Sequence, residues 1–112
     1  MTLTGKAKDD FDNWYINQNY IMDLTTDLSP HTPVVGFDEL DNPMKYGVFV
    51  DWFDSVGIYV DIEYLGGDLF AMLWNTTGHQ LPFGRSQLFE TRFEARTVAI
   101  EKANEIYNKR HE

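Results

Sequence analysis

The sequence predicts an α+β fold: a three-stranded antiparallel sheet flanked by an N-terminal and a C-terminal helix (α-β-β-β-α), with a single layer of helix on the sheet. Three observations support this fold class. A helix-start signal and a helical apolar pattern lie near the C-terminus, alternating apolar segments fill the middle of the chain, and glycine-containing turns separate those segments. At 112 residues the chain has the length of one domain, so we expect a single domain over residues 1–112.

Helices are expected at both ends of this arrangement. Thr91 and Glu94 have the spacing of a capping box, which predicts a helix over residues 92–109. Its apolar positions recur with helical period: Ala99, Ile100, Ala103, Ile106 and Tyr107. A similar pattern predicts a helix over residues 6–19, with one face formed by Ala7, Phe11, Trp14, Tyr15 and Gln18. Residues 23–44 contain three prolines and a glycine, so we expect a long, partly packed loop there.

Three strands are expected between the helices, because the intervening segments alternate and are rich in β-branched and aromatic residues. The predicted strands cover residues 46–54, 58–65 and 68–75. Ser55-Val56-Gly57 fits a three-residue hairpin loop, and Gly66-Gly67 fits a two-residue turn. The following segment, 79–90, is expected to be a loop with at most a short fourth strand.

These turns fix the register of the strands and therefore the two faces of the sheet. In the second hairpin the expected pairs are Val60 with Leu73, Ile62 with Ala71, and Tyr64 with Leu69. One face is apolar and should be covered by the C-terminal helix: Val48, Val50, Trp52, Ile58, Val60, Ile62, Tyr64, Leu69, Ala71 and Leu73. The aromatic and acidic residues of the other face are the predicted partner-binding residues, and the whole face is Phe49, Asp51, Phe53, Tyr59, Asp61, Glu63, Phe70, Met72 and Trp74.

Three interpretations of this second face remain open, since Asp51 would lie opposite Asp61 and a dry face would not hold three unpaired carboxylates. In the first, the long loop or the first helix covers the rings, and the carboxylates lie at the rim or pair with Arg85 or Arg92. In the second, the face binds a partner or a second copy of the chain through its aromatic residues. In the third, Asp51, Asp61 and Glu63 form a divalent-metal or acid–base site.

The charge of the chain favours a basic protein partner. The net charge is −9, and residues 9–68 hold 13 acidic residues and one basic residue, Lys45, a net charge of −12. Such a surface repels nucleic acid and anionic membranes, because lysine and arginine supply most phosphate affinity. It attracts a basic groove on another protein.

Composition restricts the chemistry further. There is no cysteine, which excludes disulfides and thiolate sites, and the three histidines are far apart in sequence. We find no catalytic motif and expect neither enzymatic activity nor a cofactor. No apolar stretch approaches the length of a membrane span, and no secretion signal is recognised, so a cytoplasmic location is expected.

Two segments of the chain resemble known classes of protein. The element order and Glu94-Ala95-Arg96-x-x-Ala99-Ile100-x-Lys102-Ala103 resemble a double-stranded-RNA-binding domain, whose second helix is alanine-rich. Glu94 interrupts the basic cluster that this family has at the helix start, so the resemblance extends to architecture and not to RNA binding.

The segments Tyr46–Gly57 and Thr91–Asn108 also resemble small uncharacterised proteins of phages and mobile elements. This resemblance implies a phage origin, and then a host-cell cytoplasmic location. The leading expectation is a non-enzymatic acidic binding protein, for example an inhibitor of host defence that imitates DNA. The alternatives are a homo-oligomeric assembly subunit that buries the aromatic face, and a small metal-dependent hydrolase.

Overall fold

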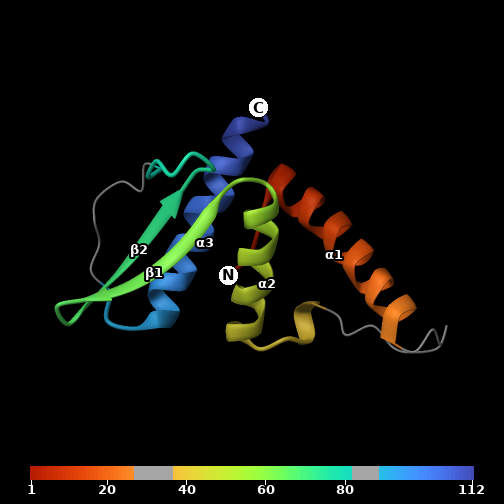
Figure 1. Ribbon diagram of the computed structural model, residues 1–112, viewed down its shortest axis with the longest axis horizontal. Helices are drawn as coiled ribbons and strands as arrows, with labels where there is room; N and C mark the ends of the chain where they lie inside the picture. Colours follow the sequence, from red (N-terminus) through yellow and green to blue (C-terminus); the bar gives the residue numbers. More distant parts are fainter. Residues whose placement is uncertain (27–36, 82–88) are drawn as a thin grey trace.

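The structure is a computed structural model that describes residues 1–26, 37–81 and 89–112, without the side chains of residues 18–26 and 65. Figure 1 shows the hairpin crossing the C-terminal helix, with the other helices on one side of it. The elements are α1 (Gly5–Thr26), the short 3₁₀ helix η1 (Phe37–Glu39), α2 (Asn42–Ser55), β1 (Tyr59–Leu65), β2 (Asp68–Trp74) and α3 (Arg92–Arg110).

The predicted fold is wrong in one major element, because residues 42–55 form helix α2 where the sequence predicts a strand over 46–54. The sheet therefore has two strands, not three. The helix begins at Asp41, whose carboxylate accepts a hydrogen bond from the Met44 amide at 3.1 Å, and Pro43 lies in its first turn. Its buried side chains are Phe49, Trp52 and Phe53, which have the i, i+3, i+4 spacing of a helix face.

The second predicted hairpin is confirmed in its register. Val60 pairs with Leu73, Ile62 with Ala71, and Tyr64 with Leu69. The turn between them is tight because Gly66 and Gly67 both take positive φ angles, 60° and 89°, as a type I′ turn requires. The segment 79–90 contributes two isolated antiparallel bridges to β2, Trp74 with Gln80 and Leu69 with Phe89.

Helix α3 confirms the predicted C-terminal helix and its N-cap, since the Glu94 amide donates to the Thr91 hydroxyl at 3.1 Å. It packs against both strands of the hairpin. Small side chains make this approach close, and the buried ones on α3 include Ala95, Ala99 and Ala103. On the facing side of β2, the buried residues are Leu69, Ala71 and Leu73.

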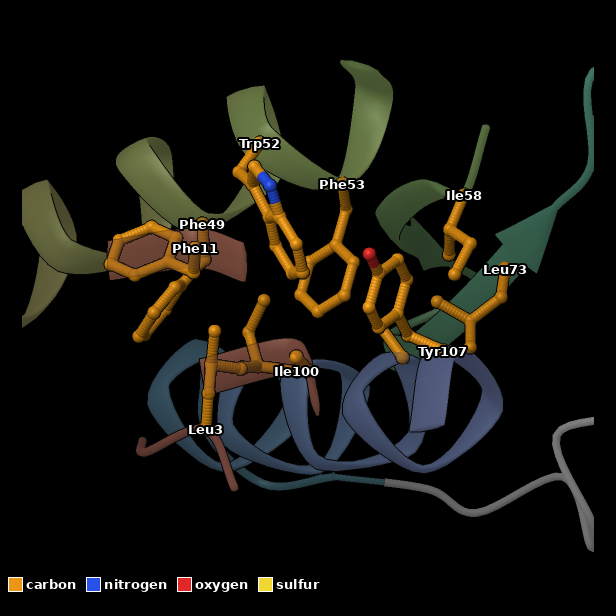
Figure 2. Packing of buried hydrophobic residues seen from close by; sticks show 11 residues of the cluster. Leu3, Phe11, Phe49, Trp52, Phe53, Ile58, Leu73, Ile100 and Tyr107 are labelled. Atoms are coloured by element: carbon orange, nitrogen blue, oxygen red, sulfur yellow. The ribbon is translucent and has the colours of Figure 1, made fainter. Parts of the chain in front are cut away.

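An aromatic cluster fills the centre of the molecule (Figure 2). The ring centroids of Phe11 in α1 and Phe49 in α2 are 5.0 Å apart, and those of Trp52 and Tyr107 in α3 are 4.9 Å apart. All four residues are buried, so the cluster joins the three helices. Rings of this size bury large apolar areas and gain further from tilted and edge contacts.

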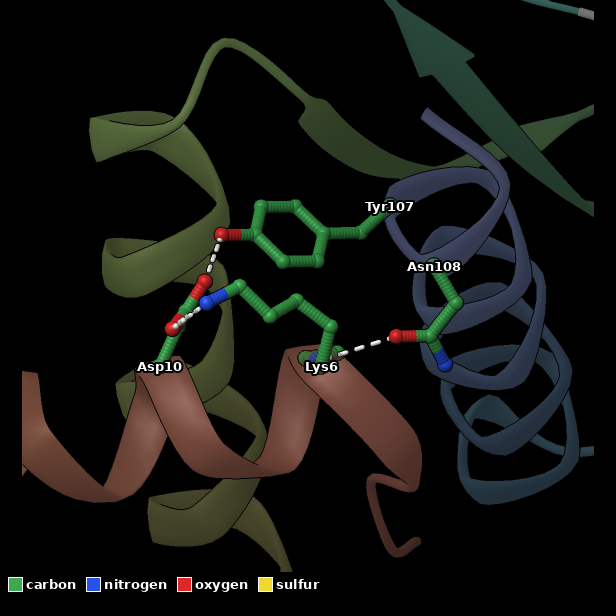
Figure 3. A network of polar contacts seen from close by, with 5 residues as sticks. Lys6, Asp10, Tyr107 and Asn108 are labelled. Atoms are coloured by element: carbon green, nitrogen blue, oxygen red, sulfur yellow. Dashed lines mark hydrogen bonds and ion pairs between the residues drawn. The ribbon is translucent and has the colours of Figure 1, made fainter. Parts of the chain in front are cut away.

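Polar contacts fasten the start of α1 to the end of α3 (Figure 3). The Asn108 side-chain oxygen accepts from the Ala7 amide at 2.7 Å, and the Tyr107 hydroxyl donates to the Asp10 carboxylate. Lys6 lies 3.1 Å from the other oxygen of Asp10. The hydrogen bond from Tyr107 lowers the pKa of Asp10, and burial together with that bond raises the pKa of Tyr107 to about 12.

The helix predicted over 6–19 is therefore present, but it extends over Gly5–Thr26. The loop predicted over 23–44 overlaps the C-terminal end of α1. From residue 37 onward, this predicted loop contains η1 and the first residues of α2. Its middle, 27–36, lies outside the described residues. Among the helices that the structure describes, none is long and apolar enough to cross a membrane.

Candidate functional site

An open pocket of about 370 Å³ lies where α2, β1 and the first turns of α3 meet. Figure 1 shows that β1 is the strand of the hairpin nearer to α2. The pocket is therefore bordered by a helix, the outer edge of a strand and a helix start. The residues that line it are Tyr46, Gly47, Val50, Asp51, Val60, Asp61, Ile62, Arg92 and Arg96.

The residues of the predicted partner-binding face do not all lie together, because residues 42–55 form helix α2 and not a strand. Phe49 and Phe53 belong to the buried core, with exposures of 1% and 0%, and so cannot contact a partner in this fold. Asp51 is exposed on α2 and does not pair with Asp61 across a sheet. Both carboxylates nevertheless line the pocket, one from the helix and one from the strand.

The remaining predicted residues share the outer face of the hairpin. The register places Tyr59 opposite Trp74 and Glu63 opposite Phe70, with Asp61 and Met72 between these pairs. Tyr59 is 40% exposed and Asp61 is also exposed, while the other four are half-buried. The hairpin alone thus holds five of the eight predicted binding residues on one face.

Three exposed carboxylates gather at the end of α2 and the start of β1, and we call Asp51, Asp54 and Asp61 the α2–β1 acidic surface. Burial raises the pKa of Asp54, and the neighbouring charge of Asp51 raises it further. Among the described residues, the ion pairs join Lys6 to Asp10, Lys8 to Asp12 and Lys102 to Glu105, and none involves the α2–β1 acidic surface. Arg92 and Arg96 line the same pocket as Asp51 and Asp61 without forming such an ion pair.

The opposite wall of the pocket is basic. The Arg96 guanidinium lies over the Tyr46 ring, 5.0 Å from its centroid, and Arg92 lies one helical turn before it. Burial raises the pKa of Tyr46 to about 12, and Asp61 and Asp54 act in the same direction against the opposing effect of Arg96. The predicted pairing of Arg92 with the carboxylates is not observed, and Arg85 lies outside the described residues.

In the described part of the chain, no group of three or more His, Asp or Glu side chains is placed to hold a metal ion. Asp51, Asp61 and Glu63 are thus not brought together as a three-carboxylate centre. His79 lies in a turn where its Nδ1 is 2.8 Å from the Thr77 hydroxyl. The same turn is closed by the Asn75 side chain, so the local contacts of His79 serve the turn.

A second pocket of about 300 Å³ lies over the aromatic cluster between α1, η1 and α2. Its floor includes Phe11, Phe37 and Phe49, whose rings contact one another, and Lys45 lies over the Phe37 ring. These rings are engaged in core packing, and this pocket does not border a strand edge.

Sequence reasoning missed Tyr46, Gly47 and Arg96 as residues that line the first pocket. The signal for Gly47 was a glycine in a segment that is otherwise rich in large side chains, which in a helix often marks a packing or functional need. Comparison with protein-family models, curated proteins and solved structures gives no match to this chain.

Proposed function

We propose that this protein is a non-enzymatic binding module that docks its α2–β1 acidic surface on a basic surface of a partner protein. The observation that carries the proposal is that Asp51, Asp54 and Asp61 are exposed, close in the fold, and outside every ion pair of the described residues.

This arrangement is unfavourable for the folded chain alone. Asp51 and Asp54 lie near the C-terminal end of α2, which has no basic residue in its last turn. A helix C-terminus carries partial negative charge, so carboxylates there are repelled by the helix as well as by each other. A basic partner would relieve both repulsions, and the net charge of −9 would speed its approach.

A nucleic-acid-binding protein is the partner class that best fits this charge, because its own binding groove is basic. Occupation of that groove would make the chain an inhibitor that imitates DNA, a role consistent with the phage-protein resemblance of residues 46–57 and 91–108.

The proposal is tested with purified basic nucleic-acid-binding proteins and immobilised chain. We expect binding to at least one of them, at least ten-fold weaker at high than at low salt, and competition by duplex DNA. The variant Asp51→Asn/Asp54→Asn/Asp61→Asn should lose this binding. The control Asp38→Asn/Asp68→Asn/Glu101→Gln removes three exposed charges elsewhere and should retain it.

Equal losses in the two triple variants would show that net charge alone is responsible and would contradict docking through the α2–β1 acidic surface. Binding that does not change with salt would contradict charge-driven recognition altogether.

The outer face of the hairpin supports a second candidate, an assembly subunit that self-associates there. Exposed Tyr59 and half-buried Phe70, Met72 and Trp74 form a continuous aromatic and apolar row across the two strands. Sedimentation over a hundred-fold range of concentration tests this candidate. A monomer at every concentration would exclude it.

A further inference from the structure

We propose that the outer edge of β1 binds an extended segment of a partner protein, which adds a third strand to the sheet and carries lysine or arginine at alternate positions. The proposal rests on the function proposed above and specifies the form in which the basic partner is recognised. It comes from the hydrogen-bonding geometry of the hairpin and from the walls of the pocket beside it.

The ladder of β1 and β2 determines which backbone groups point outward. In an antiparallel pair closed by a two-residue turn, Leu65 and Asp68 exchange hydrogen bonds, and so does every second pair after them. Val60, Ile62 and Tyr64 lie at the intervening positions, so their N–H and C=O groups point away from β2.

The same geometry is verified on the other strand. Leu69 and Leu73 occupy the intervening positions of β2, and their carbonyl oxygens accept hydrogen bonds from the Phe89 amide at 3.3 Å and the Leu81 amide at 2.7 Å. Two outward carbonyl groups of β2 are therefore occupied. Over residues 1–26, 37–81 and 89–112, no backbone hydrogen bond reaches the outward groups of Val60 or Ile62.

An open edge of this kind binds extended chains, because it presents unpaired donors and acceptors in a row. Val60, Asp61 and Ile62 form one side of the 370 Å³ pocket, with α2 and the start of α3 as its walls. A single extended segment would lie beside β1 between these walls. A partner segment is favoured over a second copy of this chain, because a net charge of −9 opposes the approach of two copies.

Gly47 lines the α2 side of this pocket and has no side chain to fill the space beside β1. It lies inside α2, where glycine is unfavourable, and a Cβ built on it would meet no atom within 4 Å. Core packing therefore does not require glycine at this position. A larger side chain would project into the space beside β1.

Alternation along the bound segment determines its preferred residues. The residue opposite Asp61 directs its side chain to the same side as that carboxylate, which is the face of the sheet that α3 does not cover. Arg92 and Arg96 line the pocket from α3, whereas Asp51 lines it from α2, so lysine or arginine is favoured on the Asp61 side. Its neighbours, opposite Val60 and Ile62, direct their side chains to the other face and supply the N–H and C=O groups that pair with β1. Apolar residues suit those positions because Val60 and Ile62 are half-buried.

The test uses the peptide Lys-Val-Lys-Val-Lys-Val-Lys and the same peptide with N-methylated valines, which keeps the charge and removes the donors. We expect the unmodified peptide to bind at least ten-fold more tightly in fluorescence anisotropy. At saturation it should slow hydrogen exchange of the Val60 and Ile62 amides at least ten-fold. Gly47→Leu should weaken binding at least ten-fold, whereas the matched Gly47→Ala should change it less than three-fold.

Equal binding of the two peptides without protection of Val60 and Ile62 would overturn strand addition and leave charge-driven docking in place. Binding of neither peptide would also overturn strand addition. The binding assay with basic nucleic-acid-binding proteins tests the proposed function separately. Protection of these amides that rises with protein concentration in the absence of peptide would overturn it by assigning the edge to a second copy.

Discussion

At the scale of single residues, Asp54 shows how the fold tolerates an unfavourable charge. Its pKa is raised by burial and by Asp51, so the folded state binds a proton at Asp54 more tightly than the unfolded chain does. The ionised carboxylate therefore costs stability above the folded-state pKa. This cost disappears as the pH falls below the unfolded-state pKa, which is about 4.

We predict that Asp54→Asn stabilises the protein at pH 7 by about 0.3–0.5 kcal/mol, a modest gain because the group is exposed and screened. The gain should vanish near pH 3, and urea unfolding at the two pH values measures it. Because the same change should weaken binding to a basic partner, stability and binding should move in opposite directions. A variant that loses stability at pH 7 would show that the carboxylate has a structural role.

At the scale of elements, the contact between α1 and α3 depends on a small number of polar groups. The buried Tyr107 donates a hydrogen bond from its hydroxyl to the Asp10 carboxylate, and the Asn108 side-chain oxygen accepts one from the Ala7 amide. Hydrogen bonds to charged groups contribute more than neutral ones, and Tyr107 also packs on the Trp52 ring.

We predict that Tyr107→Phe, which keeps the ring and removes the hydroxyl, destabilises the fold by about 1–2 kcal/mol at pH 7 in urea unfolding. Because the pKa of Asp10 is lowered in the folded state, its contribution is present above the unfolded-state pKa and is lost as pH falls through the folded-state pKa. The difference between wild type and variant should therefore narrow in acid. Exposed Tyr64→Phe is the control and should change stability by less than about 0.5 kcal/mol.

The elements differ in how far their sequences determined them. The capping box at Thr91 and the two glycines at 66–67 act locally, and the helix and hairpin that they predict are both present. Residues 46–54 satisfy two periods at once, since Phe49, Trp52 and Phe53 fit a helix face while the alternating valines fit a strand. Burial of all three rings against α1 and α3 decided the outcome, and tertiary packing of this kind is not visible in local propensity. The helix-start signal of Asp41 and Pro43 could have predicted that residues 42–55 form a helix.

The candidate site follows the same division. Its half on the hairpin could be predicted, because alternation places Tyr59, Asp61 and Glu63 on one face of β1. Its other half could not be predicted. Asp51 lines the pocket because residues 42–55 form a helix, and Arg96 lines it because α3 packs beside that helix.

At the scale of the whole molecule, the distribution of charge dominates the electrostatics. The net charge is −9, and the ion pairs among the described residues lie within α1 and within α3. Excess charge of one sign destabilises a compact state through repulsion between like charges, which salt screens over about 10 Å at 0.1 M.

We predict that raising sodium chloride from about 0.05 to about 0.5 M increases the melting temperature by a few degrees, since about 1 kcal/mol corresponds to roughly 4–8 °C in a small domain. Calorimetry at pH 7 measures this shift. The variant Asp51→Asn/Asp54→Asn/Asp61→Asn should show a smaller increase, and an equal increase would place the main repulsion elsewhere on the chain.

The fastening of α1 to α3 also has a consequence for how the protein is made. The Thr4 and Ala7 amides are held by Asn104 and Asn108, about a hundred residues later in the chain. During synthesis, the segment that contacts the first helix therefore emerges after the other helices and strands that the structure describes. Until residues 92–110 emerge, Phe11, Phe49 and Trp52 have no third helix to cover them, and we expect the growing chain to stay open to chaperones and proteases until then.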